Sequence, residues 1–306
     1  MTKVGKFQRS ADDRARLGVV VDGQAVDVNA LARRLDDAAV LPPGGFPDLR
    51  ALLLESDTIG ERVTAALAKH PDGGHPLEDV TPAAPFVETA KILCHVVNYT
   101  AHGAEAKVEA PSRPFFFLKP GSSVAGPTDD IIAHRNSAQM DYEIELAAVI
   151  GRPGRDLTED EVYDHIAGYT VMNDVSYRDL QWNADAPDLS ARYGQNWTQG
   201  KGLDRSCVLG PWITLSDEIP DPYPLDLRTW VNGDLRQEAS TNEQIYRLPA
   251  LVSAISAGMT LHPGDIIATG SPGGGAIADG RFLGPGQVVK GWIESVGEIE
   301  NRVVEP

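Results

Sequence analysis

The stretch Met140-Asp-Tyr-Glu-Ile-Glu-Leu-Ala-Ala-Val-Ile-Gly151 decides the fold, because two glutamates lead directly into an apolar run rich in β-formers. Side chains alternate between the faces of a strand, so Glu143 and Glu145 point the same way and Ile144 faces the opposite layer. Like charges side by side repel, and near a core they also carry a desolvation cost. A hard divalent cation removes both penalties, since Mg²⁺, Mn²⁺ and Ca²⁺ prefer oxygen ligands. The alternative interpretation is an ordinary solvated strand face.

Length, charge and cysteine content limit the class of protein. The chain of 306 residues is long enough for one large domain or for a large and a small one, and its net charge of −17 argues against nucleic acid and anionic membranes as partners. Met1 to Phe7 contain no apolar run, and no stretch approaches the roughly 18 apolar residues of a membrane span. Cys94 and Cys207 belong to no redox or metal motif and are typical of buried thiols. We therefore expect a cytoplasmic protein.

The first 85 residues predict a small α/β domain. Leu17 to Val28 form two β-branched runs around Asp22-Gly23, which is a strong signal for a hairpin. Asn29 is then expected to cap a short helix from Ala30 to Leu35. The domain division expected from these features is 1–85 and 86–306.

The boundary is indicated by a change in composition. Residues 46–70 have helical spacing, interrupted near residues 58–60, and residues 71–85 are rich in proline and glycine. Beyond this linker the chain is mostly strands. The expected strands lie within residues 91–97, 113–119, 140–151, 168–174, 208–232, 265–270 and 286–304.

A third carboxylate follows the two glutamates in the chain. Thr158 and Glu161 form a capping box that begins a short helix ending at Ile166, and the next strand ends at Asp174. Three carboxylates from two neighbouring strands would cover one side of an octahedral ion and leave the remaining positions to water or a chelating substrate. The alternative role for Asp174 is a helix N-cap.

Other polar groups accompany the carboxylates. His102 and Glu105 can meet on one helical face, where a carboxylate would orient the imidazole as a base, or they form a surface pair. Lys201 lies between glycines and would face an anionic substrate or be an ordinary exposed lysine. Residues 269–275 resemble a phosphate-binding glycine loop but lack its glycine order, its lysine and a following helix, which excludes a nucleotide site. Such a loop can still present amides and hydroxyls to a carboxylate.

Taken together, these residues resemble the fumarylacetoacetate hydrolase family, in particular its acylpyruvate hydrolase, oxaloacetate decarboxylase and hydroxyhepta-diene-dioate isomerase branch. The resemblance covers about residues 91–304, with its segments in the right order. The matching segments are Asn98-Tyr99…His102…Glu105, Phe117-Leu-Lys119-Pro, Asp141-Tyr-Glu-Ile-Glu-Leu, Gly168-Tyr-Thr-Val-Met-Asn-Asp-Val-Ser-Tyr-Arg-Asp-Leu-Gln181, Lys201-Gly, Gly210-Pro-Trp, Val231-Asn-Gly…Gln237, Leu261-His-Pro-Gly-Asp-Ile-Ile-Ala-Thr-Gly-Ser-Pro272 and Gly297-x-x-x-Asn301.

The resemblance implies a fold and a metal. The fold would be α+β and mostly β, with a mixed, strongly bent β-roll as the catalytic domain and the small N-terminal α/β domain that many members carry. Homodimers are usual in the family, so the resemblance also implies a homodimer. The metal would be Mg²⁺ or Mn²⁺, with Ca²⁺ also possible, on the residues that match the family's ligands, Glu143, Glu145 and Asp174.

The resemblance also implies roles for the other polar residues. The pair His102 and Glu105 matches the family's water-activating dyad, and the residue matching Lys201 orients the substrate or its attacking water. The positions that match residues near the substrate are Arg178, Gln181 and Ser271. The chain departs from the family at Tyr177, where a small residue is usual, and at Ser271 with its following glycines, where a threonine pattern is commoner. These departures leave the exact substrate open.

The expected function is a divalent-metal-dependent hydrolase that cleaves a C–C bond in a 2,4-dioxo acid through a metal-stabilised enolate. Glu105 would orient His102, which takes a proton from water. Decarboxylation of a 2-oxo acid and isomerisation of a dienoate use the same enolate and stay open as alternatives. A rival of another class is a calcium-stabilised binding module without chemistry, which would not account for the accompanying histidine, lysine and arginine.

Overall fold

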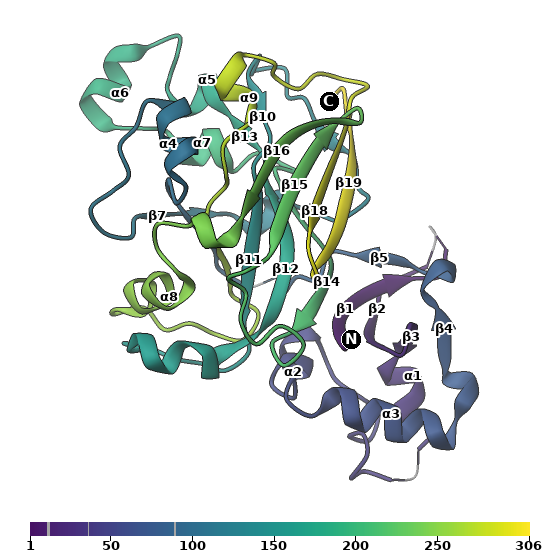
Figure 1. Cartoon of the computed structure of the whole chain (residues 1–306). Coiled ribbons are helices and arrows are strands. Elements are labelled where there is room, and N and C mark those ends of the chain that lie inside the picture. The colour runs from purple at the N-terminus through teal and green to yellow at the C-terminus, as the bar shows by residue number, and fades with distance from the viewer. Residues whose placement is uncertain (11–12, 36, 89) are drawn as a thin grey trace.

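The computed structural model describes residues 1–10, 13–35, 37–88 and 90–306. Figure 1 shows a small N-terminal part beside a larger part built mainly from long strands. Both parallel and antiparallel pairs occur, and the helices are short, so the expected α+β, mostly β fold is confirmed. Among the described residues, the helices are too short or too polar for any of them to traverse a lipid bilayer.

The predicted N-terminal hairpin is confirmed. Strand β2 (Arg16–Val21) pairs in antiparallel fashion with β3 (Gln24–Asp27), and the two residues between them have left-handed backbone angles, φ 49° at Asp22 and φ 76° at Gly23. A two-residue turn with positive φ at both positions matches the right-handed twist of the flanking strands. The Asp-Gly pair therefore fixes the register of this hairpin.

The predicted start of the first helix is wrong by two residues. Helix α1 (Val28–Ala32) is capped by Asp27, whose carboxylate accepts a hydrogen bond from the amide of Ala30 at 2.8 Å. The side chain of Asn29 has a different role, because it exchanges two hydrogen bonds of 2.9 and 2.8 Å with the backbone of Phe46. Asp and Asn are equally good caps, so the long-range contact of Asn29 decides between them. The helix also ends before Leu35.

Two helices cover one side of the N-terminal strands. They are α2 (Leu49–Leu53) and α3 (Ile59–Lys69). The predicted interruption is present, but it covers residues 54–58, and Ile59 and Gly60 already belong to α3. Strand β1 (Lys3–Gln8) lies between β2 and β14 (Cys207–Leu215), and the sheet therefore continues from the N-terminal part into the larger part. Strands β4 (Gly74–Pro76) and β5 (Thr81–Ala83) complete this end of the sheet. The division at residue 85 stays a prediction.

Two sheets form the larger part. The first continues from β14 through further strands, which are β12 (Ile166–Asp174), β11 (Ile144–Ile150), β17 (Ile266–Ala268), β6 (Ile92–His95) and β7 (Phe116–Lys119), with β8 (Val124–Ala125) paired to β14. The second has the order β16 (Asp234–Ser240), β15 (Asp226–Val231), β18 (Val288–Ile293), β19 (Gly297–Val304) and β9 (Ile131–Ile132). The pairs β6–β17, β8–β14 and β9–β19 are parallel, and the other pairs along these two paths are antiparallel.

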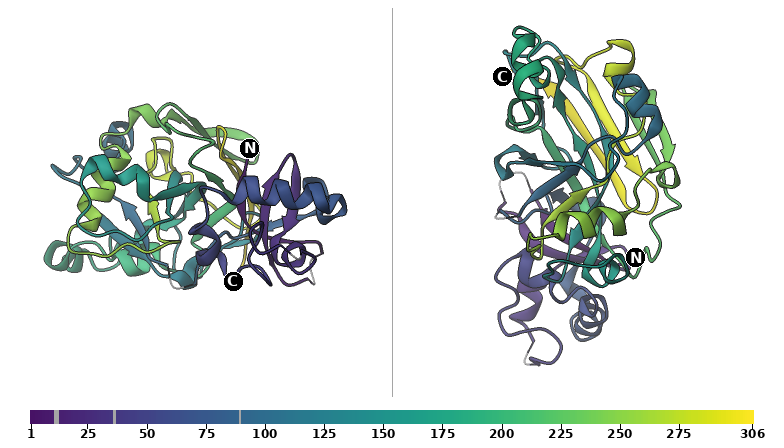
Figure 2. Two further views of the ribbon diagram at one scale, coloured as in Figure 1. Left: turned by 90° about the horizontal axis from the view of Figure 1, so that it is seen from below. Right: turned by 90° about the vertical axis from the view of Figure 1, so that its left-hand side faces the viewer.

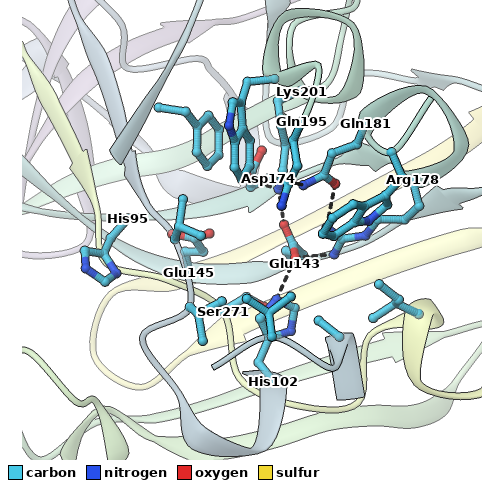
Figure 3. Close-up of a pocket in the computed structure, with 18 residues that line it drawn as sticks. His95, His102, Glu143, Glu145, Asp174, Arg178, Gln181, Gln195, Lys201 and Ser271 are labelled. Carbon is cyan, nitrogen blue, oxygen red and sulfur yellow. Dashed lines mark hydrogen bonds and ion pairs between the residues drawn. The ribbon is translucent and has the colours of Figure 1, made fainter. Parts of the chain in front are cut away.

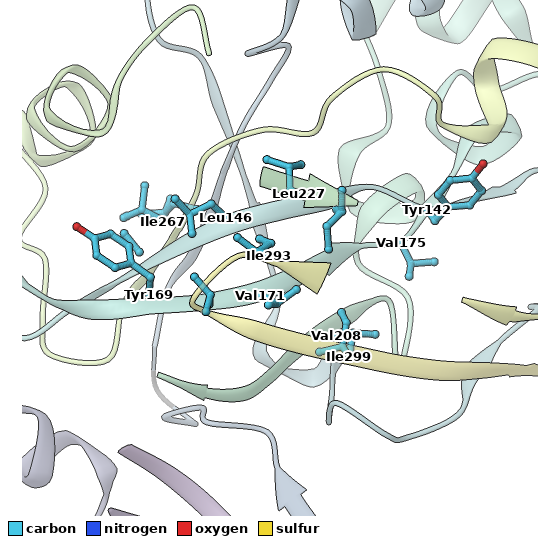
Figure 4. Close-up of a cluster of buried hydrophobic side chains, with 14 of the residues drawn as sticks. Tyr142, Leu146, Tyr169, Val171, Val175, Val208, Leu227, Ile267, Ile293 and Ile299 are labelled. Carbon is cyan, nitrogen blue, oxygen red and sulfur yellow. The ribbon is translucent and has the colours of Figure 1, made fainter. Parts of the chain in front are cut away.

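The main core lies between these two sheets. Figure 4 shows Leu146 and Val171 of the first sheet together with Leu227, Ile293 and Ile299 of the second. Each such side chain stabilises the fold by about 1.5–3 kcal/mol when it is fully buried. The opposite face of β11 is buried too, in a second cluster. A strand covered on both faces has a nearly continuous apolar sequence, and this explains why the two glutamates stand out.

Short helices gather at the end of the molecule away from the N-terminal part, as the views in Figures 1 and 2 agree. They are α4 (Thr100–Ala106), α5 (Arg178–Gln181), α6 (Pro187–Tyr193), α7 (Trp197–Lys201) and α9 (Ala276–Asp279), and beside them β10 (Met140–Asp141) pairs with β13 (Ser176–Tyr177). Helix α8 (Leu248–Ser256) lies against the predicted capping-box segment, which forms a 3₁₀ helix, Glu159–His165, with both reciprocal hydrogen bonds of the box present.

Candidate active site

Three buried carboxylates converge at this helical end. Glu143 precedes β11, Glu145 lies within it, and Asp174 is the last residue of β12. In the antiparallel register Glu145 is opposite Met172, so Asp174 lies two residues further along on the same face. One oxygen from each carboxylate lies within 4.8 Å of the others, and all three side chains are buried. Asp174 does not cap a helix, because helix α5 begins after Tyr177.

Positively charged side chains surround Glu143 and Asp174. The ammonium group of Lys201 donates to Glu143 and, at 2.7 Å, to Asp174, while the guanidinium of Arg178 donates to Glu143. Lys119 donates to the other oxygen of Asp174 at 2.6 Å. Figure 3 shows Glu143 between Lys201, Arg178 and His102. Burial raises the pKa of Glu143, but Arg178 and Lys201 outweigh it and hold this pKa well below its ordinary value.

Glu145 has no such cationic partner. In the described ranges it forms no ion pair, and its carboxylate accepts a hydrogen bond from the amide of Gly270 at 2.7 Å. Burial, together with the charges of Asp174 and Glu143, raises the pKa of Glu145 well above its ordinary value. Another positive charge beside Glu145 would offset the unfavourable free energy of ionising this buried carboxyl group next to Asp174 and Glu143. Carboxylate oxygens are hard donors, so the three side chains fit an ion such as Mg²⁺, Mn²⁺ or Ca²⁺.

The structure places His102 and Glu105 on α4, as expected, but it does not pair them. The Nε2 atom of His102 lies 3.3 Å from Glu143, and its buried Nδ1 atom has no hydrogen-bond partner in the part of the chain that is described. Glu105 instead accepts two hydrogen bonds of 2.9 Å from the amide of Gly274. Burial is the main cause that lowers the pKa of His102. The imidazole is therefore neutral near pH 7 and able to accept a proton.

Most of the predicted site residues line one cavity of about 40 Å³. A cavity of this volume has room for a few water molecules, so a larger ligand needs the surrounding segments to move. Glu105 lines a neighbouring hollow instead. The predicted residues that share the cavity are His102, Glu143, Glu145, Asp174, Arg178, Gln181, Lys201 and Ser271.

The glycine loop serves the protein's own carboxylates. Its amides bind Glu145 and Glu105, and the short helix α9, which the sequence did not predict, directs its first amides at Asp141. Ser271 is held by Gln237, whose amide group donates to the serine hydroxyl at 3.0 Å. Within residues 269–275 the loop amides bind Glu145 and Glu105 of the protein itself. Binding of a substrate carboxylate by this loop stays a prediction.

Several contributors were missed at the level of the sequence. Asp141 anchors Arg178 at 2.9 Å, and Lys119 anchors Asp174, although both residues lie within the motifs quoted above. Gln195 and the stacked rings of Phe117 and Trp197, 4.7 Å apart, also line the cavity. A motif marks Asp141 and Lys119 as candidates, whereas nothing in the spacing of Gln195 distinguishes it from a surface glutamine.

Comparisons with known proteins agree with these features. Residues 91–304 match the family model described as fumarylacetoacetate (FAA) hydrolase C-terminal, over the range indicated by the motifs. The mitochondrial oxaloacetate tautomerase fahd2 of Xenopus laevis is 34% identical, and the match covers 98% of this chain and 89% of that protein.

Solved structures are similar over the whole chain. A fumarylacetoacetate hydrolase from psychrophilic Exiguobacterium antarcticum has a TM-score of 0.79 and 32% identity, with 100% of both chains covered. A maleylpyruvate hydrolase from Sphingobium sp. SYK-6, in complex with manganese(II) ion and pyruvate, has a TM-score of 0.74 and 31% identity, with 100% of this chain and 99% of that chain covered.

Proposed function

Because the chain belongs to the fumarylacetoacetate hydrolase family, we propose that it is a divalent-metal-dependent enzyme that acts on a 2-oxo or 2,4-dioxo acid. The observation that carries this proposal is the set of three buried carboxylates in one cavity with Lys201 and Arg178. Glu143, Glu145 and Asp174 would hold Mg²⁺ or Mn²⁺, and such an ion supplies Lewis-acid polarisation of the substrate carbonyl. Lys201 stays charged, because Asp174 and Glu143 raise its pKa against the effect of burial.

We propose that the reaction is hydrolysis of a C–C bond in a 2,4-dioxo acid. Neutral His102 takes a proton from water, and the resulting hydroxide attacks the distal carbonyl carbon. The C–C bond then breaks, its electron pair leaves with the smaller oxo acid as an enolate, and a proton from His102 converts the enolate to the keto form. In this mechanism Glu105 leaves the amide of Gly274 and orients His102, which lies one helical turn away. Lys201 binds substrate oxygens as a fixed cation.

A second candidate is keto–enol tautomerisation of oxaloacetate. Two observations favour it: the Xenopus laevis relative carries this activity in its name, and His102 contacts Glu143 rather than Glu105. Conversion of the enol to the keto form removes one proton from oxygen and adds one to carbon, so a single proton-transferring group and an enolate-stabilising site are sufficient. It does not need the water-orienting pair.

Purified protein with Mg²⁺ or Mn²⁺ separates these reactions. Hydrolysis of acylpyruvates is followed by loss of diketone absorbance and by pyruvate release, and tautomerisation by the decay of enol-oxaloacetate absorbance without pyruvate. Turnover of acylpyruvates is the expected result. If neither substrate reacts with either ion while Ca²⁺ still raises the melting temperature, the non-catalytic binding module is the better interpretation.

The metal assignment has its own test. Glu143→Ala should abolish metal-dependent turnover while the fold is retained, and the exposed Glu78→Ala is the matched control that keeps full activity. Calorimetric titration with Mn²⁺ measures the loss of binding directly. Unchanged rates in Glu143→Ala would show that the ligand assignment is wrong. The homodimer and the cytoplasmic location stay predictions, and the name of the Xenopus relative places that protein in mitochondria.

A further inference from the structure

Gln195 lies on the segment between α6 and α7 and lines the same cavity as the three carboxylates. Two hydrogen bonds hold its segment against helix α5: the amide of Asn196 donates to the backbone carbonyl of Gln181 at 2.8 Å, and the side-chain amide of Gln181 donates to Oε1 of Gln195 at 2.6 Å. Helix α7 packs closely on Gln181, because a Cβ atom at Gly200 would lie 2.5 Å from the Cβ atom of Gln181. Gln195 is therefore anchored by its acceptor end.

The orientation of both amide groups follows from Arg178. A guanidinium has donors and no acceptor, so its Nη1 atom, 3.0 Å from Gln181, must face the Oε1 atom of that residue. The Nε2 atom of Gln181 then points to Gln195, and only Oε1 of Gln195 can accept from it. The Nε2 donor of Gln195 is left without a hydrogen-bond partner among the described residues.

Arg178, which sets the orientation of the two glutamine amides, is buried. Arg178 is fixed by Asp141, which accepts from its Nε atom at 2.9 Å and also from the amide of Ala276. The chain of donors thus runs in one direction, from the arginine through Gln181 to Gln195. Hydrogen bonds in series polarise one another, and a cation at the start increases the positive charge on the last N–H group. That group favours an anionic acceptor.

We propose that Gln195 is a specificity-determining residue that donates a hydrogen bond to a carboxylate at the distal end of the substrate. This inference rests on the proposed function, in which the keto-acid end of the substrate lies at Glu143, Glu145 and Asp174. Gln195 is connected to Glu143 through Gln181 and Arg178, and among the described residues no hydrogen bond joins Gln195 to the three carboxylates directly. Figure 3 shows it at the side of the cavity that Lys201 and Gln181 line. In our proposal this side receives the part of the substrate away from the reacting carbonyl. The enzyme therefore prefers dicarboxylic over monocarboxylic oxo acids.

Binding measurements test this preference without requiring turnover. Calorimetry with Mn²⁺ present compares the affinities for 2-oxopentanedioate, which ends in a carboxylate, and 2-oxopentanoate, which ends in a methyl group. The same comparison is made with 2-oxohexanedioate and 2-oxohexanoate. The wild-type protein should bind the dicarboxylates more tightly. Gln195→Leu should lower the ratio of the two affinities by about tenfold, the value for one hydrogen bond to a charged group. Gln195→Glu, which places a carboxylate there, should invert the ratio.

The matched control is Gln199→Leu, an exposed glutamine on α7 that does not line the cavity. It should keep the wild-type ratio. If Gln195→Leu weakens the binding of the dicarboxylate and of the monocarboxylate equally, or changes neither affinity, the ratio stays at the wild-type value and the inference is overturned. Equal weakening would show that Gln195 only holds its segment in place. Absence of turnover in the wild-type protein would contradict the proposed function, while the affinity ratios would still decide the role of Gln195.

Discussion

At the scale of single residues, the site consists of buried charges that compensate one another. Lys119 is almost fully buried, and its ammonium group donates to Asp174 at 2.6 Å and to the carbonyl of Val175 at 3.3 Å. Removing one partner of a buried ion pair is strongly destabilising, and of its two cationic partners among the described residues Asp174 would keep Lys201 alone. We therefore expect Lys119→Met to lower the free energy of unfolding by about 3 kcal/mol in metal-free protein. Urea unfolding with a chelator present measures the change.

A surface pair supplies the comparison for this substitution. Lys290 lies 2.9 Å from Glu298, and the glutamate is more than half exposed. Solvent screens such pairs, so Lys290→Met should change the unfolding free energy by less than about 1 kcal/mol. Equal effects of the two substitutions would mean that Lys119 does not stabilise Asp174.

Another residue-scale prediction concerns His95, which is buried against the rings of Phe116 and Tyr246 and has no hydrogen bond to either ring nitrogen in the described structure. Burial lowers the pKa of His95 to about 4. The unfolded chain binds a proton near pH 6.5 and the folded chain only near 4, so stability is lost as the pH falls through this window. The loss amounts to about 3 kcal/mol.

His95→Phe should remove this acid-dependent loss, because phenylalanine fits the aromatic surroundings and does not titrate. Urea unfolding at several pH values between 7 and 4 measures the difference in slope between variant and wild type. The exposed His262 is the control position, and His262→Gln should keep the wild-type slope. Parallel curves for His95→Phe and the wild type would refute this assignment.

At the scale of elements, the loop between β17 and α9 joins the site, which lies on the first sheet, to β16 of the second sheet. The amide of Gly274 donates to Glu105, its φ angle is +92°, and a Cβ atom there would lie 1.9 Å from the carbonyl oxygen of Arg236. Gly274→Ala should therefore cost both the strain of the left-handed backbone and the clash. We expect a destabilisation about 2 kcal/mol larger than for a glycine with positive φ in open space.

Gly280 is such a glycine, with φ +76° and nothing within 4 Å of an added Cβ atom. Gly280→Ala isolates the backbone strain of about 1 kcal/mol, and the difference between the two variants in urea unfolding gives the cost of the clash. Urea unfolding of Gly274→Ala and Gly280→Ala with Mn²⁺ present shows whether the clash also affects the carboxylate site, because the amide of Gly270 in the same loop binds Glu145. Identical losses for the two alanine variants would exclude a tight contact at Gly274.

Some of these elements follow directly from local sequence. The Asp22-Gly23 turn and the capping box of Thr158 need only neighbouring residues, so the sequence predicts them correctly. The cap of α1 could not be predicted, because Asn29 instead bonds to the backbone of Phe46, which is distant in the chain. The position of Glu105 likewise depends on its hydrogen bond from the distant Gly274. Spacing along a helix shows which side chains can meet, but not which competing partner they choose.

At the scale of the whole molecule, the site is assembled from segments that are far apart in the chain. The pairing of β11 with β12 brings Asp174 to the two glutamates, and a register shift of one residue would turn it to the opposite face. The carboxylates could therefore be predicted from strand alternation and family motifs. The order of hydrogen bonds from Asp141 to Gln195 could not, because it depends on where α5, α7 and the segment between them pack.

The N-terminal part is joined to this assembly by a shared core. Its apolar side chains pack with Val149, Ala167, Ile213 and Leu215 of the larger part, and β1 covers the edge of β14. A fragment of residues 86–306 exposes these side chains and an unpaired strand edge, both of which promote association. We expect the fragment to aggregate, or to melt well below the full chain, in size-exclusion chromatography and thermal unfolding. Polar replacements at Ile213 and Leu215 should then restore part of its solubility. A fragment that elutes as a compact species and melts at the temperature of the full chain would instead establish residues 86–306 as an autonomous domain, with the shared core contributing little.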